Sequence, residues 1–274
     1  MELKIYENLS QKEYRSNREF LSASDIKLLL ENPYKFKVGY QKPKSDNLAL
    51  GSLIHTLILE YNKFEKEYLI MPELNLRTNE GKEKKAELEA IALNEKKTLI
   101  KNEVYNQALE VVENFNKTSI SNLFKQKGLA EASFFGKIDD ISCKCRTDFI
   151  ISEKEIILDL KTTSVENGAS ADIFSKTIAN FKYYIQASFY LELTKAKEFY
   201  FVVLETNNPF MVGVYKLDRQ SLEFGMSEVR RAFEIYKNLD KFKDSVFLDF
   251  ENEYKAVQEL TLPNYVYYQK GASL

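Results

Sequence analysis

Residues 142–163 read SCKCRTDFIISEKEIILDLKTT and contain two strand-like stretches joined by a short charged turn. Side chains alternate between the two faces of a strand, so Asp148 shares a face with Arg146 in the first stretch. In the second stretch Asp159 and Lys161 share a face. If the two strands are neighbours in a sheet, we expect two carboxylates and one amine to converge at one point.

The two carboxylates favour a bound cation. Asp159 lies in the apolar run IILDL, where burying a carboxylate is costly unless a cation pairs with it. A neighbouring Asp148 adds like-charge repulsion, which pushes a proton onto the pair. A divalent cation resolves both problems, and carboxylate oxygens favour Mg2+ or Mn2+. The alternative is an ordinary ion pair between Asp159 and Lys161, which those two residues alone also permit.

The sequence around this stretch predicts an α/β fold. Residues 129–163 alternate with a period of two and predict three antiparallel strands in a meander. A helix is expected near 183–193, followed by strands at 198–206 and 211–217 that are joined by a turn containing Asn-Asn-Pro. An amphipathic helix at about 219–238 completes the layers.

The N-terminal half predicts mainly helices. A short helix begins at Ser22 or Ser24 and stops before Pro33. The segment Leu48–Glu60 is apolar nearly all round and predicts a buried helix, and 82–117 predicts one or two solvated helices. Without repeats or a linker, residues 1–274 are expected to form a single domain, with a helical part at about 1–120 and a catalytic core at about 121–265.

Composition excludes several classes of protein. The chain has 274 residues, 44% of them hydrophobic, which excludes global disorder. No run approaches the roughly 18 apolar residues of a membrane span, and the first thirty residues lack the apolar core of a signal peptide, so a cytoplasmic protein without a membrane partner is expected. A net charge of −2 argues against a generally basic nucleic-acid binder and leaves a local basic channel open.

Cys143 and Cys145 are the two cysteines. Strict alternation places both on one face with Phe149, while Asp148 and Ile150 lie opposite, so the thiols are a poor disulfide pair. A metal half-site would need further partners, and the single histidine lies far upstream in the sequence. We therefore interpret them as buried strand thiols.

The string Asp148-x10-Asp159-Leu160-Lys161 resembles the D…(D/E)xK signature of the PD-(D/E)XK nuclease superfamily, with Thr147 where the nominal Pro would stand. The resemblance implies a restriction-endonuclease-like core, in which helices flank a mixed central sheet.

Further motifs resemble the RecB-like branch of this superfamily. His55 in ALGSLIHTLILE resembles its histidine metal ligand, Gln186 and Tyr190 match its QxxxY motif, and Glu131 matches the acid that opens the first core strand. The segment from Asn75 to Gly81 and DLKTT resemble the nuclease domain of the exonuclease VIII (RecE) group, over roughly residues 20–265. A lone histidine on an apolar helix is otherwise more typical of a hydrogen-bonded core residue.

The resemblance implies a set of site residues. His55, Asp148, Asp159 and the backbone carbonyl of Leu160 would hold a catalytic Mg2+, for which Mn2+ would substitute. Lys161 would orient or help deprotonate the attacking water and offset charge on the scissile phosphate.

The remaining site residues would act around this centre. Glu131 would anchor a second metal or the attacking water. Gln186 and Tyr190 would position DNA, and Arg77 and Thr78 would bind a 5′-terminal phosphate or the strand backbone. Arg77 could equally be a solvated loop residue.

The function implied is a Mg2+-dependent double-strand DNA exonuclease of phage or prophage type. It would digest one strand from 5′ to 3′, leave a 3′ overhang and act with a RecT-like single-strand annealing recombinase. The resemblance also implies a homo-oligomer such as a tetramer.

Two other functions are compatible with the same fold. One is a repair or defence nuclease of the Cas4 type, which usually holds an iron–sulfur cluster through four cysteines, whereas this chain has two. The other is a catalytically inactive module of the same fold that only binds DNA or protein. A cleavage assay with and without EDTA separates an active nuclease from such a module.

Overall fold

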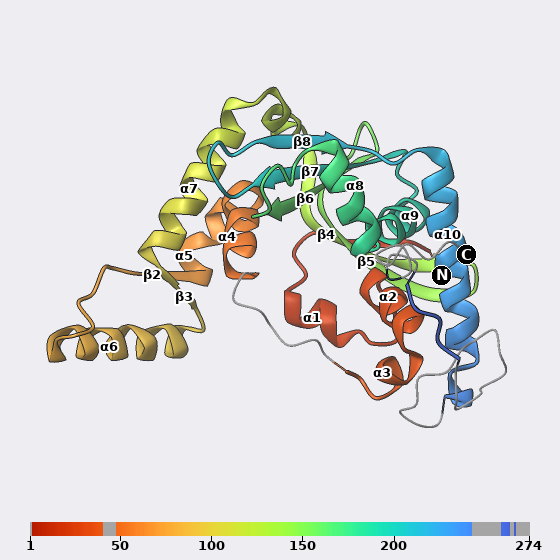
Figure 1. Cartoon of the computed structure of the whole chain (residues 1–274), viewed down its shortest axis with the longest axis horizontal. Helices are drawn as coiled ribbons and strands as arrows, with labels where there is room; N and C mark the ends of the chain where they lie inside the picture. The colour runs from red at the N-terminus through yellow and green to blue at the C-terminus, as the bar shows by residue number, and fades with distance from the viewer. Residues whose placement is uncertain (1, 41–47, 243–258, 264–265, 267–274) are drawn as a thin grey trace.

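The computed structural model of the chain describes residues 2–40, 48–242, 259–263 and 266 (Figure 1). The predicted end of the core at about 265 lies outside these residues, as does most of the C-terminal segment LTLPNYVYYQKG. Within the described part of the chain, no helix is both long enough and apolar enough to cross a membrane.

The centre of the fold is a six-stranded mixed sheet in the order β1-β4-β5-β6-β7-β8. Its strands are β1 (Lys4–Tyr6), β4 (Gly128–Ile138), β5 (Ile141–Ile151), β6 (Ile156–Thr163), β7 (Glu198–Glu205) and β8 (Val212–Tyr215). The antiparallel pairing of β4 with β5 and of β5 with β6 confirms the predicted meander. Strand β7 pairs parallel with β6 after a helical crossover, so the predicted mixed α/β fold is confirmed.

Helices pack on both sides of this sheet. Helices α2 (Ala23–Glu31), α9 (Tyr183–Thr194) and α10 (Arg219–Lys237) share one hydrophobic cluster with β4 and β5. A second cluster joins α4 (Leu48–Leu59) and α7 (Asn102–Lys117) to β6 and β7. The two groups of helices lie on either side of the strands in Figure 1.

Local sequence explains where these helices begin and how closely they pack. Ser22 caps α2 through a reciprocal capping box with Asp25, which decides between the two predicted cap residues. Asp218 caps α10 by accepting a hydrogen bond from the backbone N–H of Ser221. In α4, a Cβ at Gly51 would lie 3.0 Å from Oγ1 of Thr162, so the glycine allows α4 to lie directly against β6.

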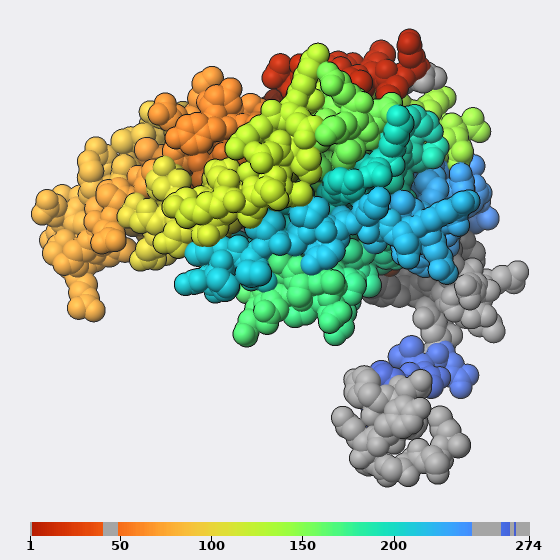
Figure 2. Space-filling view, turned by 90° about the horizontal axis from the view of Figure 1, so that it is seen from above, coloured from red at the N-terminus to blue at the C-terminus, as the bar shows by residue number. Residues whose placement is uncertain are grey.

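The region between α4 and α7 differs in detail from the prediction. The stretch 82–117 forms two helices as predicted, α6 (Asn79–Glu95) and α7, but β3 (Thr98–Lys101) lies between them and pairs in parallel with β2 (Tyr68–Met71) as a separate two-stranded sheet. Their alternation is too short to stand out beside the charged helical sequence. This segment extends from the body of the protein and forms one end of the molecule (Figures 1 and 2).

The remaining elements are short or connect the main layers. They are α1 (Gln11–Ser16), α3 (Pro33–Lys37), η1 (Tyr61–Lys63), α5 (Phe64–Glu67), η2 (Ser119–Lys125), α8 (Ala171–Asn180) and η3 (Leu239–Lys241). Helices α8 and α9 together form the crossover that makes β7 parallel to β6.

Candidate metal centre and active site

The candidate site lies where β5 and β6 separate. The two strands pair only through Ile151↔Ile156, Ile150↔Ile157 and Phe149↔Leu158. Asp148 and Asp159 are the next residues beyond the last pair, so both carboxylates stand at this fork. Oδ2 of Asp148 accepts a hydrogen bond of 2.7 Å from the backbone N–H of Leu160, which ties the two strands together beyond the end of their ladder.

Three ligand-type side chains converge at the fork from three elements. His55 comes from α4, Glu131 from β4 and Asp148 from β5, and their ligand atoms all lie within 4.8 Å of one another. Nδ1 of His55 is 3.8 Å from Oδ2 of Asp148. An imidazole nitrogen with carboxylate oxygens is a donor set that divalent cations accept.

The backbone at Glu131 is unusual. Its φ is +49°, and neither Glu131 nor Asp148 appears in the β4–β5 ladder, whereas the flanking pairs Ala130↔Phe149 and Ala132↔Thr147 do. A left-handed non-glycine residue within a strand costs about 1–3 kcal/mol and is typical of functional sites. The carboxylate is therefore held at the fork by a strained backbone.

The predicted alternation along β5 is wrong at this point. Cys143 and Cys145 pack in the cluster of α2, α9 and α10, and Ile150 contacts that same cluster. Phe149 packs instead with Ile151 and Leu158 in a different cluster. Strict alternation required Cys145 and Phe149 to share a face, so it is interrupted between them, where β4 carries the left-handed Glu131.

Electrostatics at the fork suit a cation. Burial, reinforced by Asp148 and Glu60, raises the pKa of Glu131 to about 8. Burial also raises the pKa of Asp148, although Lys161 and the hydrogen bond from Leu160 oppose the shift. These shifts arise because buried acids without enough positive charge favour the neutral form. The acids therefore meet the electrostatic condition for binding a divalent ion.

His55 is neutral at physiological pH and free to act as a ligand. Burial and the nearby Lys161 lower its pKa to about 4, against the opposing effects of Asp159 and a hydrogen bond with the Leu160 backbone. A metal ligand must be the unprotonated imidazole. The backbone of Leu160, whose carbonyl was the predicted fourth ligand, thus lies next to the imidazole.

Asp159 and Lys161 form a second group beside these three residues. The two side chains form an ion pair, and Oδ1 of Asp159 accepts a hydrogen bond of 2.8 Å from Nε2 of Gln186. Burial raises the pKa of Asp159 to about 6. Burial opposes the charge on Lys161, but Asp159 and Asp148 together raise its pKa, so the amine stays protonated. Asp159 therefore faces Lys161 and Gln186 rather than the group of His55, Glu131 and Asp148.

The structure places the two residues of the QxxxY motif inside the protein. Gln186 reaches Asp159, so it orients a carboxylate at the fork. Tyr190 is partly buried, with its ring 5.9 Å from that of Phe199, and burial raises its pKa well above the ordinary value. Direct DNA contact by either residue remains a prediction.

Arg77 and Thr78 lie at the start of α6. Thr78 caps this helix, because its Oγ1 accepts a hydrogen bond from the N–H of Gly81 and donates one to the carbonyl of Asn75. The segment around α6 stands apart from the sheet that carries the fork (Figure 1). The structure therefore does not bring Arg77 and Thr78 into the group at the fork, and their phosphate contact remains a prediction.

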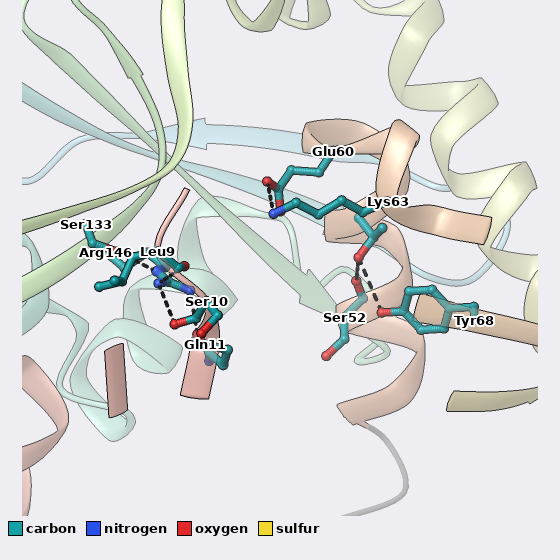
Figure 3. A network of polar contacts seen from close by, with 10 residues as sticks. Leu9, Ser10, Gln11, Ser52, Glu60, Lys63, Tyr68, Ser133 and Arg146 are labelled. Atoms are coloured by element: carbon teal, nitrogen blue, oxygen red, sulfur yellow. Dashed lines mark hydrogen bonds and ion pairs between the residues drawn. The ribbon is translucent and has the colours of Figure 1, made fainter. Parts of the chain in front are cut away.

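Sequence reasoning missed the polar surroundings of the fork. On one side, Arg146 donates hydrogen bonds to Oγ of Ser133, Oε1 of Gln11 and the carbonyl of Leu9 (Figure 3). The N-terminal segment that carries Leu9 and Gln11 is thereby fixed beside the site. Alternation put Arg146 on the face of Asp148, but nothing in the sequence indicated which segment it would bind.

A second polar pair lies near the same carboxylate. Nζ of Lys63 is 2.5 Å from Oε1 of Glu60, directly after α4 (Figure 3). Both residues influence the pKa of Glu131: Glu60 raises it and Lys63 lowers it. The fork is therefore bordered by charged residues from the N-terminal half of the chain.

The sheet, its helices and the acids at the fork define the PD-(D/E)XK class of fold. A family model described as a PDDEXK-like domain of unknown function (DUF3799) matches residues 22–245, and the chain belongs to this family. The resemblance to the PD-(D/E)XK superfamily is thereby confirmed. No curated protein matches the chain significantly.

Solved structures share the fold. A candidate exonuclease from Eubacterium rectale matches with a TM-score of 0.59 and 14% identity, over 97% of this chain and 99% of that one. An alkaline exonuclease from Laribacter hongkongensis matches with a TM-score of 0.35 and 12% identity, over 85% of this chain and 96% of that one. The first match supports the fold, and the second is too distant to add to it.

Proposed function

We propose that this protein is a metal-dependent DNA nuclease and, more narrowly, a Mg2+-dependent exonuclease that digests duplex DNA from its ends. The observation that carries the proposal is the fork. There the ligand atoms of His55, Glu131 and Asp148 lie within 4.8 Å of one another, beside the ion pair of Asp159 and Lys161. A cation site next to a protonated amine can catalyse phosphodiester hydrolysis, because both stabilise the charge that develops on the phosphate.

The site residues divide the work of hydrolysis. His55, Glu131 and Asp148 would hold the metal, with Asp159 and the Leu160 carbonyl beside them. When bound, Mg2+ supplies Lewis acidity and lowers the pKa of a coordinated water. Lys161 would hold the attacking water or donate a hydrogen bond to a phosphate oxygen. Hydrolysis forms a bond between the water oxygen and phosphorus and breaks the bond to the leaving oxygen, which takes up a proton.

Asp159 and Gln186 fix the position of the amine. The carboxylate bonds to Lys161 on one side and to Gln186 on the other. A partly buried lysine held in this way loses little freedom when the phosphate arrives, which favours the transition state. Gln186 therefore acts through Asp159 as a positioning residue.

The finer function rests on the sequence resemblance. The proposal includes three further properties. The enzyme would digest from 5′ to 3′, pass the 3′ overhang to a RecT-like annealing recombinase, and form a homo-oligomer such as a tetramer. The shared fold with the candidate exonuclease of Eubacterium rectale supports an enzyme of this kind.

The test uses the purified chain and end-labelled linear duplex DNA. With Mg2+ we expect progressive loss of nucleotides from the ends, and with EDTA we expect none. A covalently closed circle of the same sequence should survive. Nicking of the circle would contradict the exonuclease and indicate an endonuclease. DNA binding without cleavage, whichever divalent ion is added, would contradict an enzyme and indicate a binding module.

Polarity is read in the same assay. Duplexes labelled at one 5′ or one 3′ end distinguish the two directions, because only digestion from the labelled end releases labelled mononucleotide at the first step. Early release from the 5′ label supports the proposed direction. Early release from the 3′ label would reverse it.

A further inference from the structure

A stack of aromatic rings runs from the core to the surface next to the candidate site. The ring of Tyr183 stacks on the fully buried Phe201, with centroids 6.0 Å apart and 27° between planes. Phe181 stacks in turn on Tyr183 at 5.6 Å and 19°. Because Phe181 is 61% exposed, the outer end of this stack is a ring open to solvent.

The exposed ring is held on a defined corner between α8 and α9. The N–H of Phe181 donates to the carbonyl of Thr177 at 3.0 Å, and the N–H of Lys182 donates to that of Ala179 at 3.2 Å. Lys182 has a φ of +52° and turns the chain into α9. The corner thus presents an aromatic ring to solvent from a hydrogen-bonded backbone.

The stack passes directly beside the amine at the fork. Nζ of Lys161 lies 4.9 Å from the centre of the Tyr183 ring, and Nζ of Lys27 lies 5.0 Å from it. Tyr183 also begins α9, the helix that carries Gln186 and so orients Asp159. The ring stack therefore lies beside two lysine amines, which are groups that can bind a phosphate.

We propose that Phe181, supported by Tyr183, forms a stacking platform for the terminal base of the DNA strand that is cut. This inference rests on the proposed nuclease function and names how the substrate end is recognised. Aromatic rings next to cations bind nucleic acid through base stacking together with phosphate contacts, with little dependence on sequence.

Geometry selects a strand end rather than the middle of a duplex. Inside a duplex both faces of each base are covered by neighbours, so a protein ring can stack only on a terminal or unpaired base. Successive nucleotides of a strand lie about 3.4 Å apart along the axis. The ring centre of Phe181 is 5.6 Å from that of Tyr183, which is itself 4.9 Å from Nζ of Lys161, so the exposed ring lies at most about three nucleotide steps from a phosphate held at Lys161.

The test compares Phe181→Ala with two reference variants. Phe181→Trp keeps a stacking ring, and Phe224→Ala removes a similarly exposed phenylalanine, 56% exposed, on α10. Affinity for a blunt duplex is measured by fluorescence anisotropy in EDTA, so that no cleavage occurs. A second duplex, identical except that its terminal nucleotide lacks the base, reports the stacking contact itself.

We expect Phe181→Ala to weaken binding to the normal end by roughly 5- to 100-fold, the range for loss of one base–aromatic stack. The affinity of wild type should be lower by a similar factor for the abasic end than for the normal end. On the abasic end, Phe181→Ala should bind as tightly as wild type. Phe181→Trp should retain wild-type affinity, and Phe224→Ala should stay within about twofold of it.

Two outcomes would overturn the platform. The first is that Phe181→Ala and wild type bind the normal end with equal affinity. The second is that Phe181→Ala binds more weakly than wild type by the same factor on the normal and the abasic end. A change of oligomeric mass in Phe181→Ala, with DNA affinity unchanged, would make the ring a contact between copies instead. Failure of the nuclease function is read separately, as absence of cleavage by wild type with Mg2+.

Discussion

Lys161 is the residue whose replacement tests the proposed chemistry most directly. We expect Lys161→Ala to lower kcat by about 10²- to 10⁴-fold, because it removes the charge that would face the phosphate in the proposed mechanism. The fold should survive, since Asp159 already has a pKa of about 6 and can take up a proton when its partner is lost. End-labelled cleavage and far-UV circular dichroism measure the two effects.

The control for this variant is Lys216→Ala, which removes an exposed lysine paired with Glu198. It should cleave at the wild-type rate, because its charge belongs to a surface pair. Cleavage by Lys161→Ala at the wild-type rate would remove the amine from the mechanism.

His55 is expected to act through the metal rather than through the phosphate. His55→Ala should raise the Mg2+ concentration needed for half-maximal cleavage by about 10- to 100-fold, with a smaller effect at saturating metal. Direct titration with Mn2+ gives the affinity independently of activity. An unchanged metal requirement would make His55 a core histidine, the alternative that its apolar helix also permits.

The two cysteines give a pH-dependent prediction. Burial raises the pKa of Cys143 to about 12 and that of Cys145 well above its ordinary value. The unfolded chain therefore releases the thiol protons from about pH 9, whereas the folded chain keeps them. The free energy of unfolding should consequently fall as the pH rises above about 9. Iodoacetamide at pH 8 should leave both thiols unmodified in the native protein and alkylate them in urea. Rapid alkylation of the native chain would contradict their burial.

At the scale of elements, the N-terminal segment of β1 and α1 depends on Arg146. Its guanidinium bonds to Leu9, Gln11 and Ser133 and lies 4.7 Å from the centre of the Tyr14 ring. We expect Arg146→Ala to lower the free energy of unfolding by about 2–4 kcal/mol, because several charge-assisted hydrogen bonds are lost together. Urea denaturation measures the change.

Limited proteolysis locates the effect of this substitution. Cleavage should become faster within the first twenty residues, since the segment loses its anchor on β5. The matched control is Arg231→Ala, which removes an exposed arginine paired with Glu228 and should change stability by less than about 0.5 kcal/mol. Equal stability of both variants would show that the segment is held by its apolar contacts alone.

Sequence periodicity predicted most of the long elements and missed several of the short ones. The meander of β4, β5 and β6 and the helices α4, α9 and α10 carry enough residues for a clear period. Strands β1, β2 and β3 span three or four residues each, and their pairing depends on distant partners. Helix α8 was missed as well, although it completes the crossover to β7.

The sequence named the residues that meet at the fork, but not how they are arranged there. Alternation placed Asp159 and Lys161 together, and the ion pair between them is present. It did not predict that Glu131 would stand with His55 and Asp148 while Asp159 turns to Gln186. That arrangement depends on the left-handed backbone of Glu131, which local sequence does not specify.

For the whole molecule, we expect unfolding in one cooperative transition. The clusters on the two sides of the sheet share strands, because β6 and β7 contribute residues to both the α4–α7 side and the α8–α9 side. Losing one side therefore exposes the other. Tyrosine fluorescence and far-UV circular dichroism should give the same unfolding midpoint in urea. Two different midpoints would contradict the predicted single domain.

Hydrogen exchange refines this prediction. Helix α6, which buries only Gly81, Leu88 and Ala92, should exchange its amide protons faster than β6 and β7. Its segment extends from the body of the molecule (Figure 2), so it can open without disturbing the sheet. Equal protection of α6 and the central strands would contradict this order.

The left-handed Glu131 lowers the stability of the fold and, under the proposed function, serves the metal site. Without an ion, the chain bears both a disfavoured backbone conformation and a carboxyl group that resists ionisation at the same position. A glycine there would relieve both burdens and erase a ligand. Laboratory selection for thermal stability alone should therefore replace Glu131 in the first rounds. Its retention in a stabilised variant would indicate that nuclease activity had been selected as well.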